Sequence, residues 1–193
     1  MEPHLGSNDK LMFYKYLDKA SVYFEYGSGG STYQAATRSN IKKIYSVESD
    51  NAWHNHIKSM YTGNNIEFIY NEMCTAPNDW GQPGPGSTPT QRKAYSNHMR
   101  SLLPFQREAL DLVFIDGRFR VACCLKCFDI ISPDCFIAFD DFLDRAHYHV
   151  VLAYYDIVEQ TLDNRMVILQ KKKGIVSVPS ELIELYEDIK GHN

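Results

Sequence analysis

Two short β-like runs near the end of the chain, residues 156–160 and 166–170, constrain the fold more than any other feature. Two strands joined by so short a link must run antiparallel. Upstream, five short apolar runs alternate with helical stretches, a pattern typical of parallel strands joined by crossover helices. The chain therefore predicts an α/β fold whose mostly parallel sheet ends in an antiparallel pair. The five runs are residues 22–26, 44–48, 66–70, 112–115 and 135–139.

The spacing of apolar residues also predicts where helices lie. The clearest helices are expected from about Ser31 to Ser39, Arg92 to Leu103, Arg145 to Leu152 and Ser180 to Ile189.

The length of 193 residues predicts a single domain, residues 1–193, either a whole protein or one domain cut from a larger one. Residues 74–104 interrupt the regular pattern. Proline and glycine crowd this segment, so it cannot hold a regular ladder, and we expect a long loop insertion. Long loops inside compact domains often act as lids. This loop and the first helix are expected to close over a site.

Composition excludes several classes of protein. Twenty basic residues against twenty-four acidic ones give a net charge of −4, which argues against a nucleic-acid partner held by a broad basic face. The apolar runs are too short for a membrane span, and the first residues do not resemble a signal peptide. Five cysteines, an odd number, fit a reducing compartment, so a cytoplasmic location is expected. The oligomeric state stays open.

A glycine-rich turn follows the first predicted strand, in residues 25–32. Glycines at a strand-to-helix turn let the backbone approach a ligand closely, and the helix N-terminus there favours an anion. A tight turn without a ligand is the alternative explanation. Glu48, nineteen residues after Gly29, ends the second strand. An acid at about this spacing can accept the ribose hydroxyls of an adenosine cofactor, although it could also be a solvated loop acid or a helix cap.

The acid-x-Gly-x-Gly pattern of residues 25–29 resembles motif I of the class I S-adenosylmethionine-dependent methyltransferases. The order of strands, over about Tyr23 to Lys171, is similar to the Rossmann-like fold of that family. Thr32 stands where a nicotinamide dinucleotide turn would have its third glycine, so an oxidoreductase is the more distant alternative. The resemblance implies that S-adenosylmethionine is the cofactor. We expect its site to comprise Glu25, Tyr26, Gly27, Ser28, Gly29, Ser31, Thr32, Glu48 and Asp116.

Three acids stand at the ends of later strands: Asp116 after the fourth, and Asp140 and Asp141 after the fifth. Ligands in open α/β sheets bind at the carboxyl ends of the strands, so these side chains are expected beside the cofactor. Each of them could instead cap a helix. A hydroxyl is a poor nucleophile at neutral pH and needs a general base or a metal ion. We expect the three acids to form the catalytic group, with Asp140 as the base.

Residues 114–118 and 139–142 resemble sugar O-methyltransferases more narrowly. In the macrocin-type and catechol-type groups, acids matching these three hold Mg²⁺, an ion that prefers hard oxygen ligands. The macrocin-type pattern has an acid where this chain has Arg118, and a guanidinium there would supply positive charge without a metal. The sequence thus leaves open whether Mg²⁺ takes part.

The runs 24–32, 115–122 and 139–145 are most similar to the small methyltransferases of large algal viruses and some bacteria, which act on glycans, including the methylation of rhamnose. This resemblance implies a sugar hydroxyl as the acceptor and, for a viral protein, a place in the host cytoplasm. Under it Arg118, Arg120 and Arg145 would line the acceptor site, since arginine suits polyol oxygens. Trp80 and His147 are further candidates for acceptor binding.

The sequence therefore predicts an O-methyltransferase that moves a methyl group from S-adenosylmethionine to a sugar hydroxyl, with an aspartate as general base. A Mg²⁺-dependent, catechol-type enzyme acting on small molecules is one alternative. A non-catalytic domain that binds the cofactor or a glycan is the other.

Overall fold

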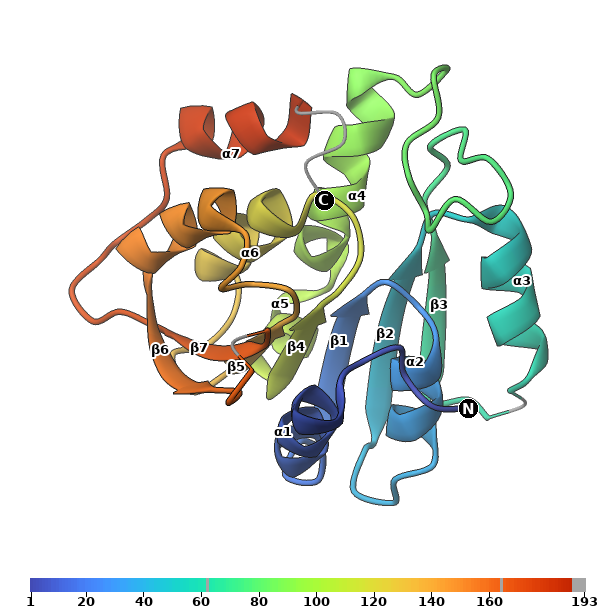
Figure 1. The fold of residues 1–193 in the computed structure, drawn as a ribbon, viewed down its shortest axis with the longest axis horizontal. Coiled ribbons are helices and arrows are strands. Elements are labelled where there is room, and N and C mark those ends of the chain that lie inside the picture. Colours follow the sequence, from blue (N-terminus) through green and yellow to red (C-terminus); the bar gives the residue numbers. More distant parts are fainter. Residues whose placement is uncertain (62, 164, 189–193) are drawn as a thin grey trace.

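One seven-stranded sheet forms the centre of the computed structural model, which describes residues 1–61, 63–163 and 165–188. The strand order is β3-β2-β1-β4-β5-β7-β6. The first five strands run parallel, and β7 runs antiparallel to both β5 and β6 (Figure 1). The predicted fold class is confirmed. The strands are β1 Val22–Tyr26, β2 Lys43–Glu48, β3 Ile66–Tyr70, β4 Leu112–Ile115, β5 Phe136–Phe139, β6 Tyr155–Gln160 and β7 Val167–Lys171.

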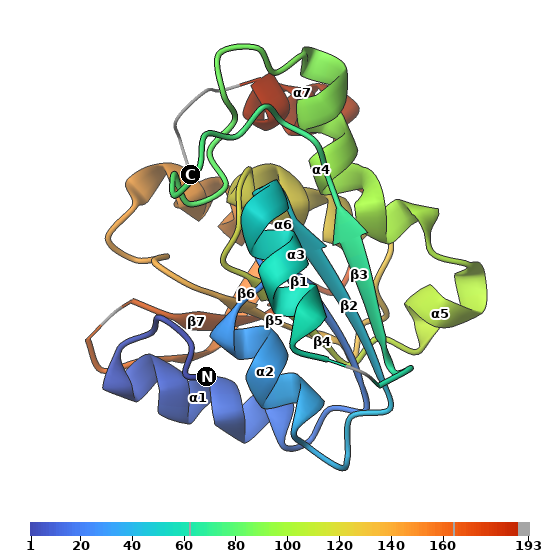
Figure 2. The ribbon, with the colours of Figure 1, turned by 90° about the vertical axis from the view of Figure 1, so that its right-hand side faces the viewer.

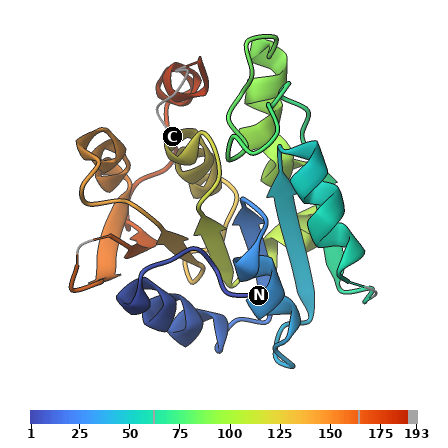
Figure 3. The ribbon, with the colours of Figure 1, turned by 45° about the vertical axis from the view of Figure 1, so that its right-hand side comes forward.

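Helices cover both faces of the sheet. Figure 2 shows α1, α2 and α3 along one face, while Figure 3 shows α6 and α7 on the other side of the strands from α1. On that second face α7 lies against α4 and α6, so segments far apart in the sequence meet. The helices are α1 Ser7–Leu17, α2 Gly30–Ala36, α3 Asn51–Ser59, α4 Pro89–Ser101, α5 Pro104–Glu108, α6 Arg120–Phe128, the 3₁₀ helix η1 Ala146–Ala153 and α7 Ser180–Asp188.

Side chains of successive strand residues alternate between the two faces, as the pleat requires. Tyr23 and Phe114 belong to the core beneath α1 and α2, whereas Phe24 and Ile115 belong to the core beneath α4 and α6. Two apolar cores therefore hold the sheet between its helical layers. The same alternation directs polar residues at the strand ends, such as Asp116 and Asp140, to the α1 face.

The predicted elements differ from the observed ones mainly in their bounds. Helix α4 begins at Pro89 instead of Arg92, because Thr88 caps it: the Thr88 hydroxyl accepts from the Gln91 N–H. The loop is therefore shorter than the expected 74–104 segment: residues 71–88 form one stretch without helix or strand, and residues 102 and 103 separate α4 from α5. The short helix α5 was not predicted, and residue 189 of the predicted last helix lies outside the described residues.

Of the helices within the described parts of the chain, none has both the length and the apolar character that a bilayer crossing demands.

Candidate functional site

Two glycine turns meet at the centre of the sheet's carboxyl edge. A Cβ atom on Gly27, whose φ is +97°, would lie 3.0 Å from the backbone of Gly117. A Cβ atom on Gly117 would lie 2.1 Å from the Tyr95 hydroxyl. A side chain at either position would therefore separate the turn after β1 from the turn after β4. By contrast, the nearest described atoms to a Cβ on Gly29 would be those of the Trp53 ring, at 4.0 Å, so a side chain at this position would meet no close contact among the described residues.

The carboxylate of Glu25 binds side chains of the glycine turn that follows β1. It is fully buried and accepts hydrogen bonds from the hydroxyls of Tyr23, Ser31, Thr32 and Ser46. Burial raises the pKa of Glu25 to about 7, against the opposing effect of these donors. Glu25 thus holds the turn in shape, and its own oxygens are already engaged by the protein.

Thr32 has a structural reason to replace a third glycine. Its hydroxyl accepts from the Gly29 N–H at 2.9 Å while it donates to Glu25. The side chain therefore closes the first turn of α2 onto the buried carboxylate, a role that a glycine could not fill. Only the backbone of Tyr26 takes part in the turn, because its hydroxyl donates to the Ser96 carbonyl on the opposite face (3.1 Å).

Glu48 lies directly beside the glycine turn. One of its oxygens accepts from the Ser28 N–H at 3.1 Å, and the other accepts from the N–H groups of Ser49 (2.6 Å) and Asp50 (2.8 Å). Burial raises the pKa of Glu48, and the three N–H donors oppose that shift. On the other side of the turn, the Trp53 indole donates to the Ser28 carbonyl at 2.8 Å. The fold brings Ser28 and Glu48 into contact, and Trp53, which was not among the residues expected at the cofactor site, lies beside them.

Two segments cover this part of the site. In the loop, the Gly81 carbonyl accepts from the Ser49 hydroxyl at 2.9 Å, and a Cβ atom on Gly81 would lie 3.3 Å from Glu48 Oε1. The N-terminal segment crosses the start of α2, where a Cβ atom on Gly30 would lie 2.2 Å from the backbone of Glu2. The segment and the loop meet through the rings of His4 and Trp80, whose centroids lie 5.4 Å apart.

The three predicted catalytic acids converge on one guanidinium, that of Arg120. Its Nη2 lies 2.9 Å from Asp116 Oδ1, and its Nη1 lies 3.4 Å from Asp141 Oδ2 and 3.9 Å from Asp140 Oδ2. Arg120 is buried, so these charges are paired away from water. We expected Arg120 to line an acceptor site, but it lies among the acids instead.

Asp140 differs from its neighbours. It is 2 % exposed, and its Oδ1 accepts no hydrogen bond from any described residue. Burial and the charges of Asp116 and Asp141 raise its pKa to about 8. Burial also raises the pKa of Asp116, although Arg120 opposes this. A buried carboxyl oxygen without a donor is costly, and such groups in native proteins often belong to functional sites.

Asp141 is bound by arginines. Besides Arg120, the guanidiniums of Arg145 (2.7 Å) and Arg165 (2.5 Å) reach its two oxygens. Burial alone would raise the pKa of Asp141, but the Arg165 hydrogen bond and the charges of Arg120 and Arg145 outweigh it and lower the pKa. Asp141, at a φ of +54°, thereby joins the loop after β5 to the β6–β7 hairpin.

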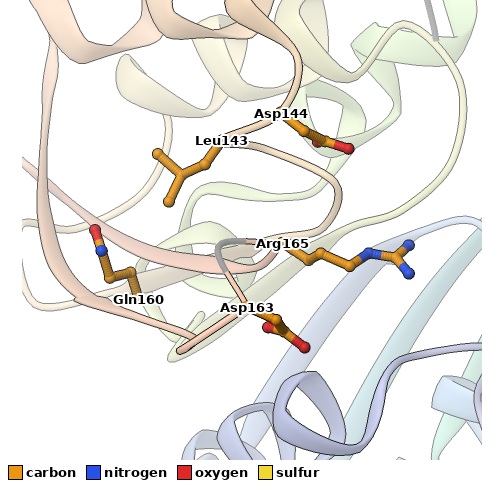
Figure 4. Close-up of a pocket in the computed structure, with 5 residues that line it drawn as sticks. All are labelled: Leu143, Asp144, Gln160, Asp163 and Arg165. Atoms are coloured by element: carbon orange, nitrogen blue, oxygen red, sulfur yellow. The ribbon is translucent and has the colours of Figure 1, made fainter.

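An open cavity of about 500 Å³ borders this cluster. Figure 4 shows the Arg165 side chain extending from the hairpin away from Gln160, so that one residue contributes both to the cavity wall and to the Asp141 ion pair. The lining residues are Leu143, Asp144, Gln160, Asp163 and Arg165.

The other predicted acceptor residues lie at different places. Arg145 also donates to the Tyr148 hydroxyl at 2.8 Å and is half-buried. Arg118 is buried, and its backbone N–H donates to the Tyr95 hydroxyl. His147 is exposed in η1 with its ring 4.5 Å from that of Tyr148, and Trp80 is 72 % exposed on the loop. The structure thus places Trp80 on the Glu48 side of the site and Arg145 and His147 on the side of β5. Arg118 lies between them, since a Cβ atom on Gly81 would be 3.3 Å from Glu48 Oε1 and 3.9 Å from Arg118 Cγ.

The acids do not fit a divalent ion. Within residues 1–61, 63–163 and 165–188, no group of three or more histidine, cysteine or acidic side chains could hold a metal ion. The Arg120 guanidinium lies among the three carboxylates, between 2.9 and 3.9 Å from each.

The fold and this site define a Rossmann-like methyltransferase architecture. The structure is similar to a methyltransferase-like protein from Silicibacter pomeroyi, with a TM-score of 0.72 and 25% identity over 96% of this chain and 94% of that one. It is also similar to the tRNA (m1A58) methyltransferase TrmI from Aquifex aeolicus, with a TM-score of 0.51 and 11% identity over 89% of this chain and 71% of that one, which supports the fold alone. No protein-family model matches the sequence. No curated protein matches it either.

Proposed function

We propose that this protein is an O-methyltransferase that uses S-adenosylmethionine to methylate a sugar hydroxyl, with Asp140 as the general base. The similarity to methyltransferase structures supports the cofactor class. One observation carries the proposal: the same edge of the sheet holds two carboxylates suited to the two parts of the reaction. Glu48 lies on the glycine turn, where it could bind the ribose, and Asp140, after β5, has a buried Oδ1 without a hydrogen-bond partner among the described residues.

The residues around the turn fit the cofactor. Gly27 lets the backbone approach closely, and the space beside Gly29 is open. Glu48 Oε2, which accepts the Ser28 N–H, could also accept a ribose hydroxyl once the loop at Gly81 moves aside. When bound, S-adenosylmethionine supplies a methyl group activated by a sulfonium. Asp116, on the neighbouring strand, completes this side of the site.

Asp140 would take the proton of the acceptor hydroxyl as the hydroxyl oxygen forms its bond to the methyl carbon. The bond from that carbon to the sulfonium sulfur would break in the same step, so that S-adenosylhomocysteine is the leaving group. The reactive form is the carboxylate, and its raised pKa makes Asp140 a stronger base than an ordinary aspartate. Asp116 and Arg120 set the charge around it, while Asp141 orients Arg145 and Arg165.

The acceptor would occupy the cavity beside this cluster. Carboxylate, amide and guanidinium groups line it, a mixture of donors and acceptors that suits the hydroxyls of a neutral sugar. Its volume is in the range of small-molecule sites. We place Arg145, Arg118 and His147 around the acceptor and Trp80 at the mouth of the site. We also propose that the protein acts in the cytoplasm and has no nucleic-acid partner.

Isothermal titration with S-adenosylhomocysteine tests the cofactor class, and methyl transfer to a panel of sugars tests the acceptor. We expect binding in the micromolar range, with or without EDTA, and transfer that is lost in Asp140→Asn. Binding without transfer to any sugar would favour the non-catalytic domain. Absence of binding together with binding of a nicotinamide dinucleotide would overturn the proposal.

A further inference from the structure

Arg120 differs from an arginine in a surface ion pair because its guanidinium is buried and contacts several oxygen atoms at once. Its guanidinium is 5 % exposed and makes five polar contacts with the two loops that follow β4 and β5. Three are the carboxylates of Asp116, Asp140 and Asp141. The other two are backbone carbonyls: Nε donates to Gly117 (3.1 Å) and Nη1 to Asp140 (2.8 Å).

Three carboxylates and two carbonyls make a set of hard oxygen donors, the kind that a divalent cation prefers. The guanidinium takes the centre of this set. Because it donates along fixed directions, it engages the Asp140 carbonyl at 2.8 Å but stays 3.9 Å from the nearer carboxyl oxygen of that residue. Asp140 Oδ1 is left without a donor.

We propose that Arg120 is a positioning residue that serves as the built-in cation of this site, so that the site takes no divalent ion and keeps Asp140 Oδ1 free for the acceptor hydroxyl. This inference rests on the proposed function for the role of Asp140. The claim that Arg120 replaces a cation stands on the contacts alone.

Charges from every neighbouring element act on Asp140. Asp116 and Asp141 follow β4 and β5, Asp9 approaches from α1, and Arg120 and Arg165 come from α6 and the hairpin. Of these cations only Arg120 reaches all three acids of the catalytic group. Removing it takes away the cation that the three carboxylates share, although Asp141 keeps Arg145 and Arg165, and a metal ion is then the best available replacement.

The test compares melting temperatures in EDTA and in MnCl₂, together with the EPR signal of bound Mn²⁺. We expect the wild type to melt at the same temperature in both, with no stoichiometric Mn²⁺ site. Arg120→Ala is expected to melt lower in EDTA and to gain about 5–10 °C when Mn²⁺ reaches roughly a hundredfold its Kd. Arg165→Ala is the matched control: it removes a guanidinium whose salt bridge is to Asp141 and leaves Arg120 in place among the acids, so it is expected not to respond.

Stoichiometric Mn²⁺ binding by the wild type would overturn the proposal. So would an Arg120→Ala protein that folds, melts lower and gains nothing from Mn²⁺, because Arg120 would then be only a structural link. If Arg120→Ala does not fold, Arg120→Gln takes its place in the same measurements. Titration of the wild type with S-adenosylhomocysteine runs beside them and shows separately whether the cofactor proposal holds.

Discussion

The backbone N–H of Ser28 donates to the carboxylate of Glu48 at 3.1 Å, which joins the glycine turn after β1 to the acid that ends β2. The two residues lie twenty positions apart in the sequence. Strands β1 and β2 are parallel neighbours, with Tyr26 opposite Val47, so their carboxyl ends meet at one edge. The glycine turn and the acid at the end of β2, each a weak indication of a cofactor site when taken alone, therefore lie in contact at one site.

Glu48→Ala is expected to weaken binding of S-adenosylhomocysteine by about 10- to 100-fold, since hydrogen bonds to a charged group contribute roughly 1.5–3 kcal/mol. Isothermal titration measures this loss. Glu67→Ala removes an exposed acid from β3, where it pairs with Lys43, and serves as the control. Equal affinities of the two variants would show that Glu48 does not contact the ligand.

Gly27→Ala is expected to lower the melting temperature more than Gly174→Ala. Both glycines have positive φ, +97° and +83°, so both substitutions strain the backbone by roughly 1–2 kcal/mol. A Cβ on Gly27 would also face another backbone at 3.0 Å, whereas no described residue lies within 4 Å of a Cβ on Gly174. Thermal melts of the two variants isolate the cost of the close approach, and equal losses would argue against a tight contact between the two turns.

The stability of the protein should depend on pH through Asp140. Its pKa is raised by burial, so the folded protein holds this proton where the unfolded chain has lost it. The resulting stabilisation is full below the ordinary carboxyl pKa of about 4 and is lost as pH rises toward about 8. Asp140→Asn, which is always neutral, should therefore gain stability relative to the wild type as pH increases over this window.

Denaturant unfolding at several pH values measures this difference. Asp134→Asn, which removes an exposed carboxylate from the turn before β5, is the control and should track the wild type. A difference between Asp140→Asn and the wild type that stays constant with pH would contradict the assignment.

The loop that carries Trp80 and Gly81 is expected to move when the cofactor site is filled. Gly81 lies against Glu48 and accepts from the Ser49 hydroxyl, so the loop covers the acid that would bind the ribose. Hydrogen exchange of residues 77–82 should change on addition of S-adenosylhomocysteine, while that of the buried strand β4 stays constant. Unchanged exchange in a protein that binds the ligand would show that the ligand enters by another route.

Most of the fold could be predicted from the sequence because it depends on local patterns. The short apolar runs set the strands to within one or two residues, and the short link between residues 160 and 166 required the antiparallel pair. The bounds of α4 were predicted less well, since its start depends on the Thr88–Gln91 capping box inside a segment that reads as a loop. The proline and glycine content of the segment predicted a loop, so the capping hydrogen bonds that begin α4 were not expected.

By itself the sequence determined that Gly27, Glu48, Asp116 and Asp140 would gather at one edge, because parallel strands bring their carboxyl ends together. Only the tertiary structure decided which arginine lies among the acids. Arg118 and Arg120 are two residues apart, separated by Phe119, whose left-handed backbone (φ +51°) directly precedes α6. The Arg120 guanidinium lies between 2.9 and 3.9 Å from the three acids. This placement depends on how α6 packs against the ends of β4 and β5, which no local pattern in the sequence encodes.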